Sequence, residues 1–177
     1  VDETKKAFGD IHILVCNAAA NPYYGPLAQI SDDAFRKILE NNIIANNWLI
    51  SMVVPEMRAR KDGSIMIVSS IGGLRGSPVI GAYCISKAAD MQLARNLAVE
   101  YGPDNVRVNC IAPGLIKTDF AKALWDDPET LKRSTSGAAL KRIGDPDEIA
   151  GCAVFLAGKA GAFVTGQNFV VDGGATI

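Results

Sequence analysis

Mostly apolar runs of strand length alternate with longer stretches of helical periodicity along this chain. Residues 65–68 are continuously apolar, and residues 11–16 are nearly so, as expected of strands that are buried on both faces. Two further strands are expected at residues 106–111 and 167–171. The alternation predicts an α/β fold of the Rossmann type, in which helices cover a doubly wound parallel sheet.

Three long helices are expected between these strands. The first starts after Ser31, a favourable N-cap, and runs to about residue 60, where we expect Gly63 to end it. The second covers residues 82–101, and the third covers residues 146–158 after an Asp-Pro-Asp-Glu start signal. Each helix would pack its apolar stripe against the sheet.

Residues 115–142 show no strong period and contain Trp125 and Pro128 among polar residues. We expect short helices there that form a substrate lid over the carboxyl edge of the sheet, where ligands bind in this architecture. The chain has no internal repeat, low-complexity tract or linker. Residues 1–177 are therefore expected to belong to a single domain.

Composition narrows the classes of partner. The formal net charge is -1, so no overall field favours nucleic acid or an anionic membrane, and a small-molecule ligand is expected. Residues 43–54, the longest apolar stretch, are too few to span a bilayer. The four cysteines are widely spaced and there is one histidine, so we expect reduced thiols, a cytoplasmic location and no metal site.

The strongest chemical pattern is a tyrosine followed four residues later by a lysine. Tyr83 and Lys87 would share one helical face, and a cation beside a phenolate lowers the phenol pKa and eases proton transfer. Ser70 lies thirteen positions before Tyr83, since 83 minus 70 is 13, at the end of a predicted strand. Its hydroxyl could bond a carbonyl oxygen as negative charge develops. Alone, the Tyr-Lys spacing is a weak pattern that more often marks a solvated helix pair.

Two further motifs accompany this set. Residues 16–19, Cys-Asn-Ala-Ala, follow the first predicted strand, and residues 109–114, Asn-Cys-Ile-Ala-Pro-Gly, end the third. Together with the Ser70, Tyr83 and Lys87 spacing, these motifs resemble the short-chain dehydrogenase/reductase family over essentially all 177 residues. The resemblance implies a nicotinamide-dependent oxidoreductase that interconverts a carbonyl and an alcohol.

In that family the tyrosine is the general acid/base, the serine orients the substrate oxygen, and the lysine binds the nicotinamide ribose and lowers the tyrosine pKa. The resemblance assigns these roles to Tyr83, Ser70 and Lys87. A fourth family residue, an asparagine that helps hold a water in a proton relay, matches Asn42, with the adjacent Asn41 as the alternative. Asn42 could equally be a satisfied interior amide.

The resemblance also implies cofactor contacts at the ends of two strands. Asn17 would border the adenosine ribose, or else be an ordinary residue at a strand end, and Thr118 and the Ile116 backbone would bond the nicotinamide carboxamide. The full set of expected cofactor-binding residues, besides Tyr83 and Lys87, is Asn17, Ala18, Ala19, Pro113, Gly114, Ile116 and Thr118.

Residues 16–22 and 112–118 look like those of the NADPH-dependent carbonyl and retinal reductases within this family, which favours NADP over NAD. Four aromatic residues in the neighbouring loops could make an apolar substrate pocket or could simply pack the lid. They are Tyr23, Tyr24, Phe120 and Trp125.

The family's first strand, Gly-rich turn and helix, which bind the cofactor pyrophosphate, have no counterpart in these residues. Residues 1–8 resemble the end of the helix that precedes the family's fourth strand. We expect the sequence to be part of a longer protein, because a strand at residues 11–16 without its inner neighbours would expose a hydrophobic edge. The alternative is a shortened, non-catalytic scaffold or oligomerisation partner.

Family members commonly pair through two long helices and the last strand. Residues 31–60 and 82–101 would supply these helices, so we expect a homodimer or homotetramer. Four apolar residues could lie at such an interface or in the core: Ile43, Ile44, Trp48 and Met91.

Overall fold

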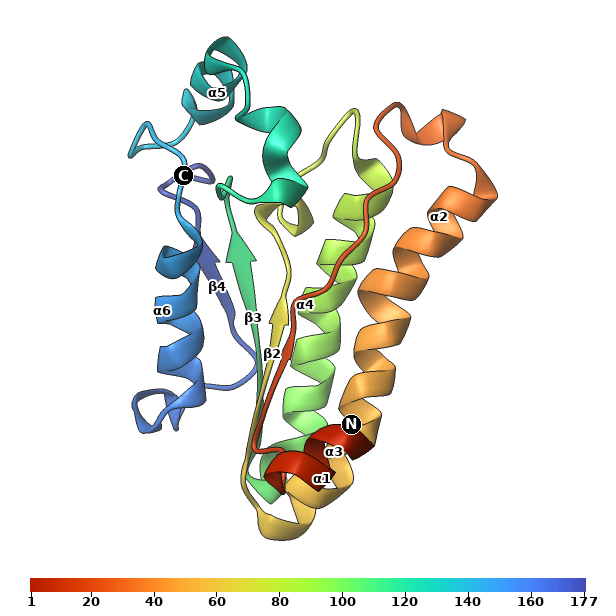
Figure 1. The fold of residues 1–177 in the computed structure, drawn as a ribbon, viewed down its shortest axis with the longest axis vertical. Coiled ribbons are helices and arrows are strands. Elements are labelled where there is room, and N and C mark those ends of the chain that lie inside the picture. The colour runs from red at the N-terminus through yellow and green to blue at the C-terminus, as the bar shows by residue number, and fades with distance from the viewer.

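The computed structural model describes all 177 residues and contains a sheet of four parallel strands in the order β1-β2-β3-β4 (Figure 1). The strands are β1 (Ile13–Cys16), β2 (Gly63–Val68), β3 (Val106–Pro113) and β4 (Asn168–Val171). All four predicted strands are present, with bounds that differ by two residues at most. The predicted class, a parallel α/β sheet of the Rossmann type, is confirmed.

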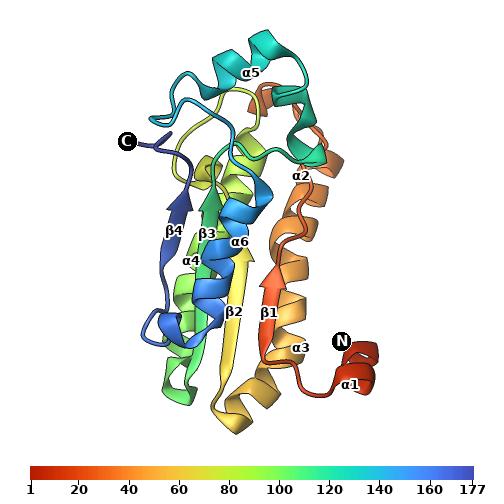
Figure 2. The same ribbon diagram turned by 60° about the vertical axis from the view of Figure 1, so that its left-hand side comes forward.

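Helices cover both faces of this sheet (Figure 2). One face is covered by α3 (Ala45–Arg60) and α4 (Gly81–Tyr101), and the other by α6 (Pro146–Ala157). Two shorter helices come earlier in the chain, α1 (Asp2–Phe8) and α2 (Asp32–Leu39).

The core has two parts because successive side chains of a strand point to opposite faces. Ile65 and Ile67 of β2 belong to the larger cluster beneath α3 and α4, whereas Met66 between them packs with Ile111 and Leu156 beneath α6. All five side chains are almost completely buried. The continuous apolar run of β2 therefore serves both layers.

Short helices fill most of the connections. The region of residues 115–142 contains a 3-10 helix, η5 (Asp119–Leu124), and one α-helix, α5 (Pro128–Thr135), as predicted. The remaining short elements are η1 (Leu27–Gln29), η3 (Ile71–Gly73), η4 (Gly102–Asp104) and η6 (Lys159–Gly161).

The predicted helix starts are confirmed by their capping contacts. The Ser31 hydroxyl accepts a hydrogen bond from the Ala34 amide at 3.2 Å, which begins α2. At the start of α6, Asp145 and Glu148 form a reciprocal capping box around Pro146, the first helical residue.

The prediction for residues 31–60 was wrong in two details. The helix is interrupted by a π-helical turn, η2 (Glu40–Ile44), between α2 and α3. It ends at Lys61, which takes a left-handed conformation with a φ of 54°, and Gly63 instead begins β2. Glycine is required there for space, since an added Cβ would lie 2.7 Å from the Met57 sulfur.

Strand β1 forms one edge of the sheet and pairs only with β2. Two of its apolar side chains are partly open, with Ile13 49% and Val15 45% exposed. The structure thus has the hydrophobic edge that the sequence led us to expect. None of the helices has both the length and the apolar character needed to cross a bilayer.

The buried centre of β2 gives a test of the packing. Replacing the fully buried Ile67 by alanine should lower the free energy of unfolding by about 2–5 kcal/mol, because the lost side chain leaves a cavity between α3, α4 and the sheet. Chemical denaturation measures the change. The matched control is Val99→Ala on α4, whose side chain is exposed and whose loss should change stability little. Equal effects of the two variants would contradict this packing.

Candidate active site

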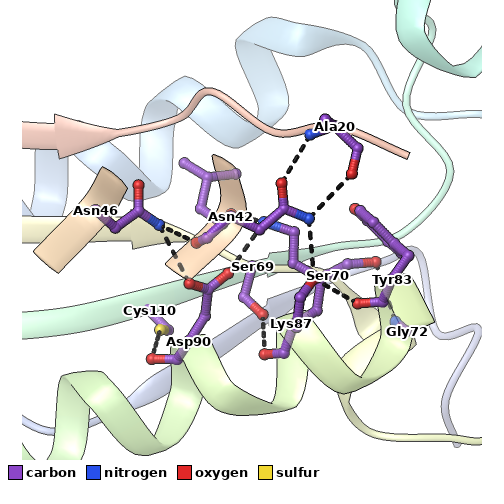
Figure 3. Close-up of polar contacts among 12 residues, drawn as sticks. Ala20, Asn42, Asn46, Ser69, Ser70, Gly72, Tyr83, Lys87, Asp90 and Cys110 are labelled. Atoms are coloured by element: carbon purple, nitrogen blue, oxygen red, sulfur yellow. Dashed lines mark hydrogen bonds and ion pairs between the residues drawn. The ribbon is translucent and has the colours of Figure 1, made fainter. Parts of the chain in front are cut away.

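Ser70 and Tyr83 meet beside Gly72 at the carboxyl end of β2. Ser70 follows β2 by two residues and caps η3, its hydroxyl accepting a hydrogen bond from the Gly72 amide at 3.0 Å. A Cβ built on Gly72 would lie 3.4 Å from the Ser70 Oγ and 3.7 Å from the Tyr83 Cε1. The hydroxyl and the phenol ring therefore border the same small space (Figure 3).

Lys87 lies one turn after Tyr83 on α4, with its Nζ 5.7 Å from the centre of the Tyr83 ring. The side chain is only 1% exposed, and its ammonium donates hydrogen bonds to the Val68 carbonyl at 2.9 Å and to the Asp90 carboxylate at 3.0 Å. An ammonium has three N–H donors, so one remains for another acceptor. The three residues predicted from spacing thus lie together.

The Tyr83 phenol holds its proton tightly. Burial raises the pKa of Tyr83 to about 12, and the negative charge of Asp90 adds to the rise, while the neighbouring Ser70 hydroxyl acts in the opposite direction. The pKa of Tyr83 thus lies above the ordinary value for a phenol, because burial is the largest influence on it. At neutral pH the phenol is therefore an acid that can donate a proton.

Asn42 sits in the π-helical turn and is completely buried. Its side-chain oxygen accepts from the Ala20 amide at 2.7 Å, and its amide nitrogen donates to the Ala20 carbonyl at 3.1 Å and to the Ser86 hydroxyl at 2.9 Å. Ser86 in turn donates to the Tyr83 carbonyl at 2.7 Å. Asn42 therefore links the loop after β1 to the first turns of α4 (Figure 3). The adjacent Asn41 is exposed and bonds only within its own helix.

Two buried residues that sequence reasoning missed complete this network. The Asn46 amide donates to the Asn42 carbonyl at 2.6 Å and to the Asp90 carboxylate at 3.2 Å. Spacing offered a hint, since Asn46 lies four residues after Asn42 and Asp90 three after Lys87, which places each pair on one helical face.

The residues after β1 lie at the same carboxyl edge of the sheet. Asn17 and Ala18 are exposed and Ala19 is half-buried, while Ala20 makes the contacts to Asn42. Parallel strands end at one edge, so this open backbone faces the same side as the ends of β2 and β3.

At the end of β3, Pro113 is followed by a glycine that permits a close backbone approach. A Cβ on Gly114 would lie 2.7 Å from the Asp172 Cα, and the Gly114 amide donates to the Val171 carbonyl at 3.0 Å. Beyond it, Ile116 forms an isolated parallel bridge with Gly144.

Thr118 starts η5, and its hydroxyl points back toward the Ile116 carbonyl, 3.5 Å away. Ile116 also lines a separate cavity of about 160 Å³ with Ile71, Leu140 and Val171. Ser70, Tyr83 and Lys87 do not line that cavity, so it is distinct from the space beside Gly72.

Of the four aromatic residues considered for a substrate pocket, one reaches the group formed by Ser70, Tyr83 and Lys87. The Phe120 ring lies 6.2 Å from the Tyr83 ring, centre to centre, at a tilt of 38°. Trp125 donates to the Thr118 carbonyl at 2.9 Å and so packs within the loop, and the Tyr23 hydroxyl donates to the Pro26 carbonyl. Tyr24 is exposed.

Comparison with known proteins identifies relatives of the whole chain. Residues 1–176 match the family model described as Enoyl-(Acyl carrier protein) reductase. The chain is 44% identical over 170 residues to dehydrogenase/reductase SDR family member 4 of Bos taurus, covering 96% of this chain and 61% of that protein. The Homo sapiens protein of the same name is 41% identical over 169 residues, covering 96% of this chain and 61% of its own length.

Solved structures share the fold. A gluconate 5-dehydrogenase from Burkholderia cenocepacia, in complex with NADP and tartrate, matches with a TM-score of 0.94 and 31% identity over 99% of this chain and 68% of that one. A 4-hydroxyisoleucine dehydrogenase complexed with NADH matches with a TM-score of 0.92 and 31% identity over 99% of this chain and 72% of that one. The chain spans about three fifths of the length of the curated relatives that it matches. From its family model and its relatives, the chain belongs to the short-chain dehydrogenase/reductase family.

Proposed function

We propose that the protein is an NAD(P)-dependent oxidoreductase that interconverts a small carbonyl compound and the corresponding primary or secondary alcohol. The observation that carries the proposal is the meeting of the Ser70 hydroxyl and the Tyr83 phenol beside Gly72, with the Lys87 ammonium under the phenol ring. Relatives that are named dehydrogenases or reductases support it.

In the proposed reaction the substrate oxygen lies between the Ser70 and Tyr83 hydroxyls. A nicotinamide bound at the carboxyl edge would supply or accept a hydride at the substrate carbon. During reduction Tyr83 donates its proton to the oxygen as negative charge develops there, and Ser70 stabilises that charge with a hydrogen bond. The Lys87 ammonium stabilises the phenolate that remains. Alcohol oxidation reverses these transfers.

The donor set fits the nicotinamide end of such a cofactor. Lys87 keeps one N–H donor after its two internal bonds, which suits a ribose hydroxyl, and Gly114 lets the backbone approach closely at the end of β3. We assign the remaining contacts to Asn17, Ala18, Ala19, Pro113, Ile116 and Thr118. Two structural relatives are titled with NADP or NADH, and the likeness to NADPH-dependent reductases favours NADP.

Asn42 is proposed to assist proton transfer indirectly. Its side chain is fully used in holding Ala20 and Ser86, which supports a role in fixing the start of α4 and hence the position of Tyr83. A water held near its backbone would complete the relay that the family likeness implies.

Residues 115–142 are proposed to form the substrate lid of a single domain. The packing of Phe120 on Tyr83 supports this, because an apolar ring above the phenol would favour apolar carbonyl substrates, as in a carbonyl reductase. A cytoplasmic location belongs to the same proposal and is supported by four free cysteines, three of them buried.

The phenol gives the main test. In the full-length protein, Tyr83→Phe should lower kcat by about 10²–10⁴-fold, because it removes only the transferable proton, while NADPH binding persists. Loss of reduced-nicotinamide absorbance with a panel of aldehydes and ketones measures turnover. The control is Tyr24→Phe, which removes an exposed hydroxyl and should leave kcat unchanged. Undiminished turnover by Tyr83→Phe would reject the assignment.

The scaffold alternative makes a different forecast for the 177-residue chain. Calorimetric titration with NADPH and NADH distinguishes the enzyme from the scaffold, since micromolar binding of either cofactor by this chain would contradict a purely structural role. Absence of any binding, together with no turnover by the full-length protein, would favour the scaffold.

We further propose that the protein is a homodimer or homotetramer built through α3 and α4. Trp48 of α3 is 60% exposed and Ile44, the last residue of η2, is 40% exposed, and their spacing of four residues puts both on one helical face, which supports an interface there. Ile43 is half-buried. Met91 is only 3% exposed and belongs to the core, so it is not part of the proposed interface. Met91 lies on the face of α4 that packs against the sheet.

Static light scattering should therefore give a mass of two or four chains, and Trp48→Glu should shift it toward the monomer, because a buried charge without a partner disfavours the interface. Leu124→Glu, an equally drastic change at an exposed position of η5, is the control and should leave the mass unchanged. A monomeric wild-type protein at working concentration would contradict the proposal.

A further inference from the structure

A carboxylate lies beside the lysine of the proposed catalytic set, where nothing assigned so far requires one. Asp90 is completely buried, and its Oδ2 lies 3.0 Å from the Lys87 Nζ, itself 1% exposed. The other carboxylate oxygen accepts from the Asn46 amide at 3.2 Å. Two charges taken this far from water persist only when they are paired and hydrogen-bonded, and here both conditions hold.

The ion pair of Lys87 and Asp90 lies between β2 and the Tyr83 phenol. Lys87 reaches from α4 to the Val68 carbonyl of β2, and the same ammonium lies 5.7 Å from the Tyr83 ring centre. Asp90 is held from the other side by Asn46 of α3, whose amide also bonds the Asn42 carbonyl. The carboxylate is thus fixed by two helices and cannot swing away from the ammonium (Figure 3).

From this geometry we propose that Asp90 is a positioning residue that fixes the Lys87 ammonium and offsets its charge at the Tyr83 phenol. The inference deepens the proposed function and rests on it for the role of the phenol. Asp90 does not touch the reacting atoms, so it acts only through Lys87.

Few other charges can substitute for Asp90. The titratable groups that interact with it, besides Lys87 and Tyr83, are Cys16 of β1 and Cys110 of β3. The Cys110 thiol donates to the Asp90 carbonyl at 3.4 Å. Burial is the main reason that the pKa of each of these two thiols is raised, so they stay neutral in the physiological range. The Lys87 and Asp90 pair therefore supplies the fixed charges beneath the phenol.

The charge of Asp90 can be separated from its shape by one substitution. Asp90→Asn keeps the size of the side chain and an oxygen acceptor for Lys87, but removes the negative charge. The ammonium then acts on the phenol unopposed, and we expect the pKa of Tyr83 to fall by about one to three pH units from its wild-type value of about 12. A residue that served only to stabilise the fold would change the melting temperature and leave this pKa where it was.

The experiment is a pH titration of the full-length protein, labelled with ¹³C at the tyrosine ring carbon that bears the hydroxyl and followed by NMR. Tyr83→Phe assigns the resonance. The control is Asp104→Asn, which removes a carboxylate from the exposed pair with Arg58 and should not move the Tyr83 titration. The double variant with Lys87→Met and Asp90→Asn should have a higher Tyr83 pKa than Asp90→Asn alone, because it lacks the ammonium charge that stabilises the phenolate.

An unchanged or higher Tyr83 pKa in folded Asp90→Asn would overturn the proposal. If that variant does not fold, Asp90→Ser repeats the test with a smaller neutral side chain and the same criterion. The titration needs neither cofactor nor substrate. Its failure therefore counts against the role of Asp90, whereas an active Tyr83→Phe enzyme would count against the proposed function.

Discussion

The structure depends on a property of parallel sheets, which is that all their strands end at the same edge. Strands β1, β2 and β3 run in parallel register, so their carboxyl ends bring together segments separated by nearly a hundred residues of sequence. Ser70 follows β2 at this edge, and α4 begins beside it with Tyr83 and Lys87 in its first two turns. The candidate site lies where these strands end. The positions of its side chains are fixed by β2 and β3, which are packed on both faces of the sheet.

A second constraint acts through the interior of the helical layer. Polar side chains of η2 and α3 bond to α4, Asn42 of η2 bonding Ser86 and Asn46 of α3 bonding Asp90. Buried polar groups of this kind are costly unless every partner is present, which ties the position of one helix to the other. The network ends at Lys87, so the arrangement that stabilises the helix pair also sets the electrostatic surroundings of Tyr83.

Much of this could be predicted from sequence, because the relevant signals are local. Strand β2 is a continuous apolar run, Ser31 and Pro146 mark helix starts by their own chemistry, and the spacing of Tyr83 and Lys87 follows directly from helical geometry. The features that escaped prediction depend on contacts between distant segments. The spacing from Lys87 places Asp90 on the same helical face, but it does not show that this face is buried, since the partner Asn46 lies 44 residues away. The π-helical turn at Glu40–Ile44 and the left-handed Lys61 also escaped prediction.

The central claim is that Ser70, Tyr83 and Lys87 form one site for a nicotinamide and a carbonyl substrate. A crystal structure of the full-length protein with NADP tests it most directly. We expect the nicotinamide ring beside Gly114, a ribose hydroxyl on the free Lys87 donor, and open space between the ring and the hydroxyls of Ser70 and Tyr83. A cofactor bound elsewhere, with these three side chains making no contact to it, would contradict the claim.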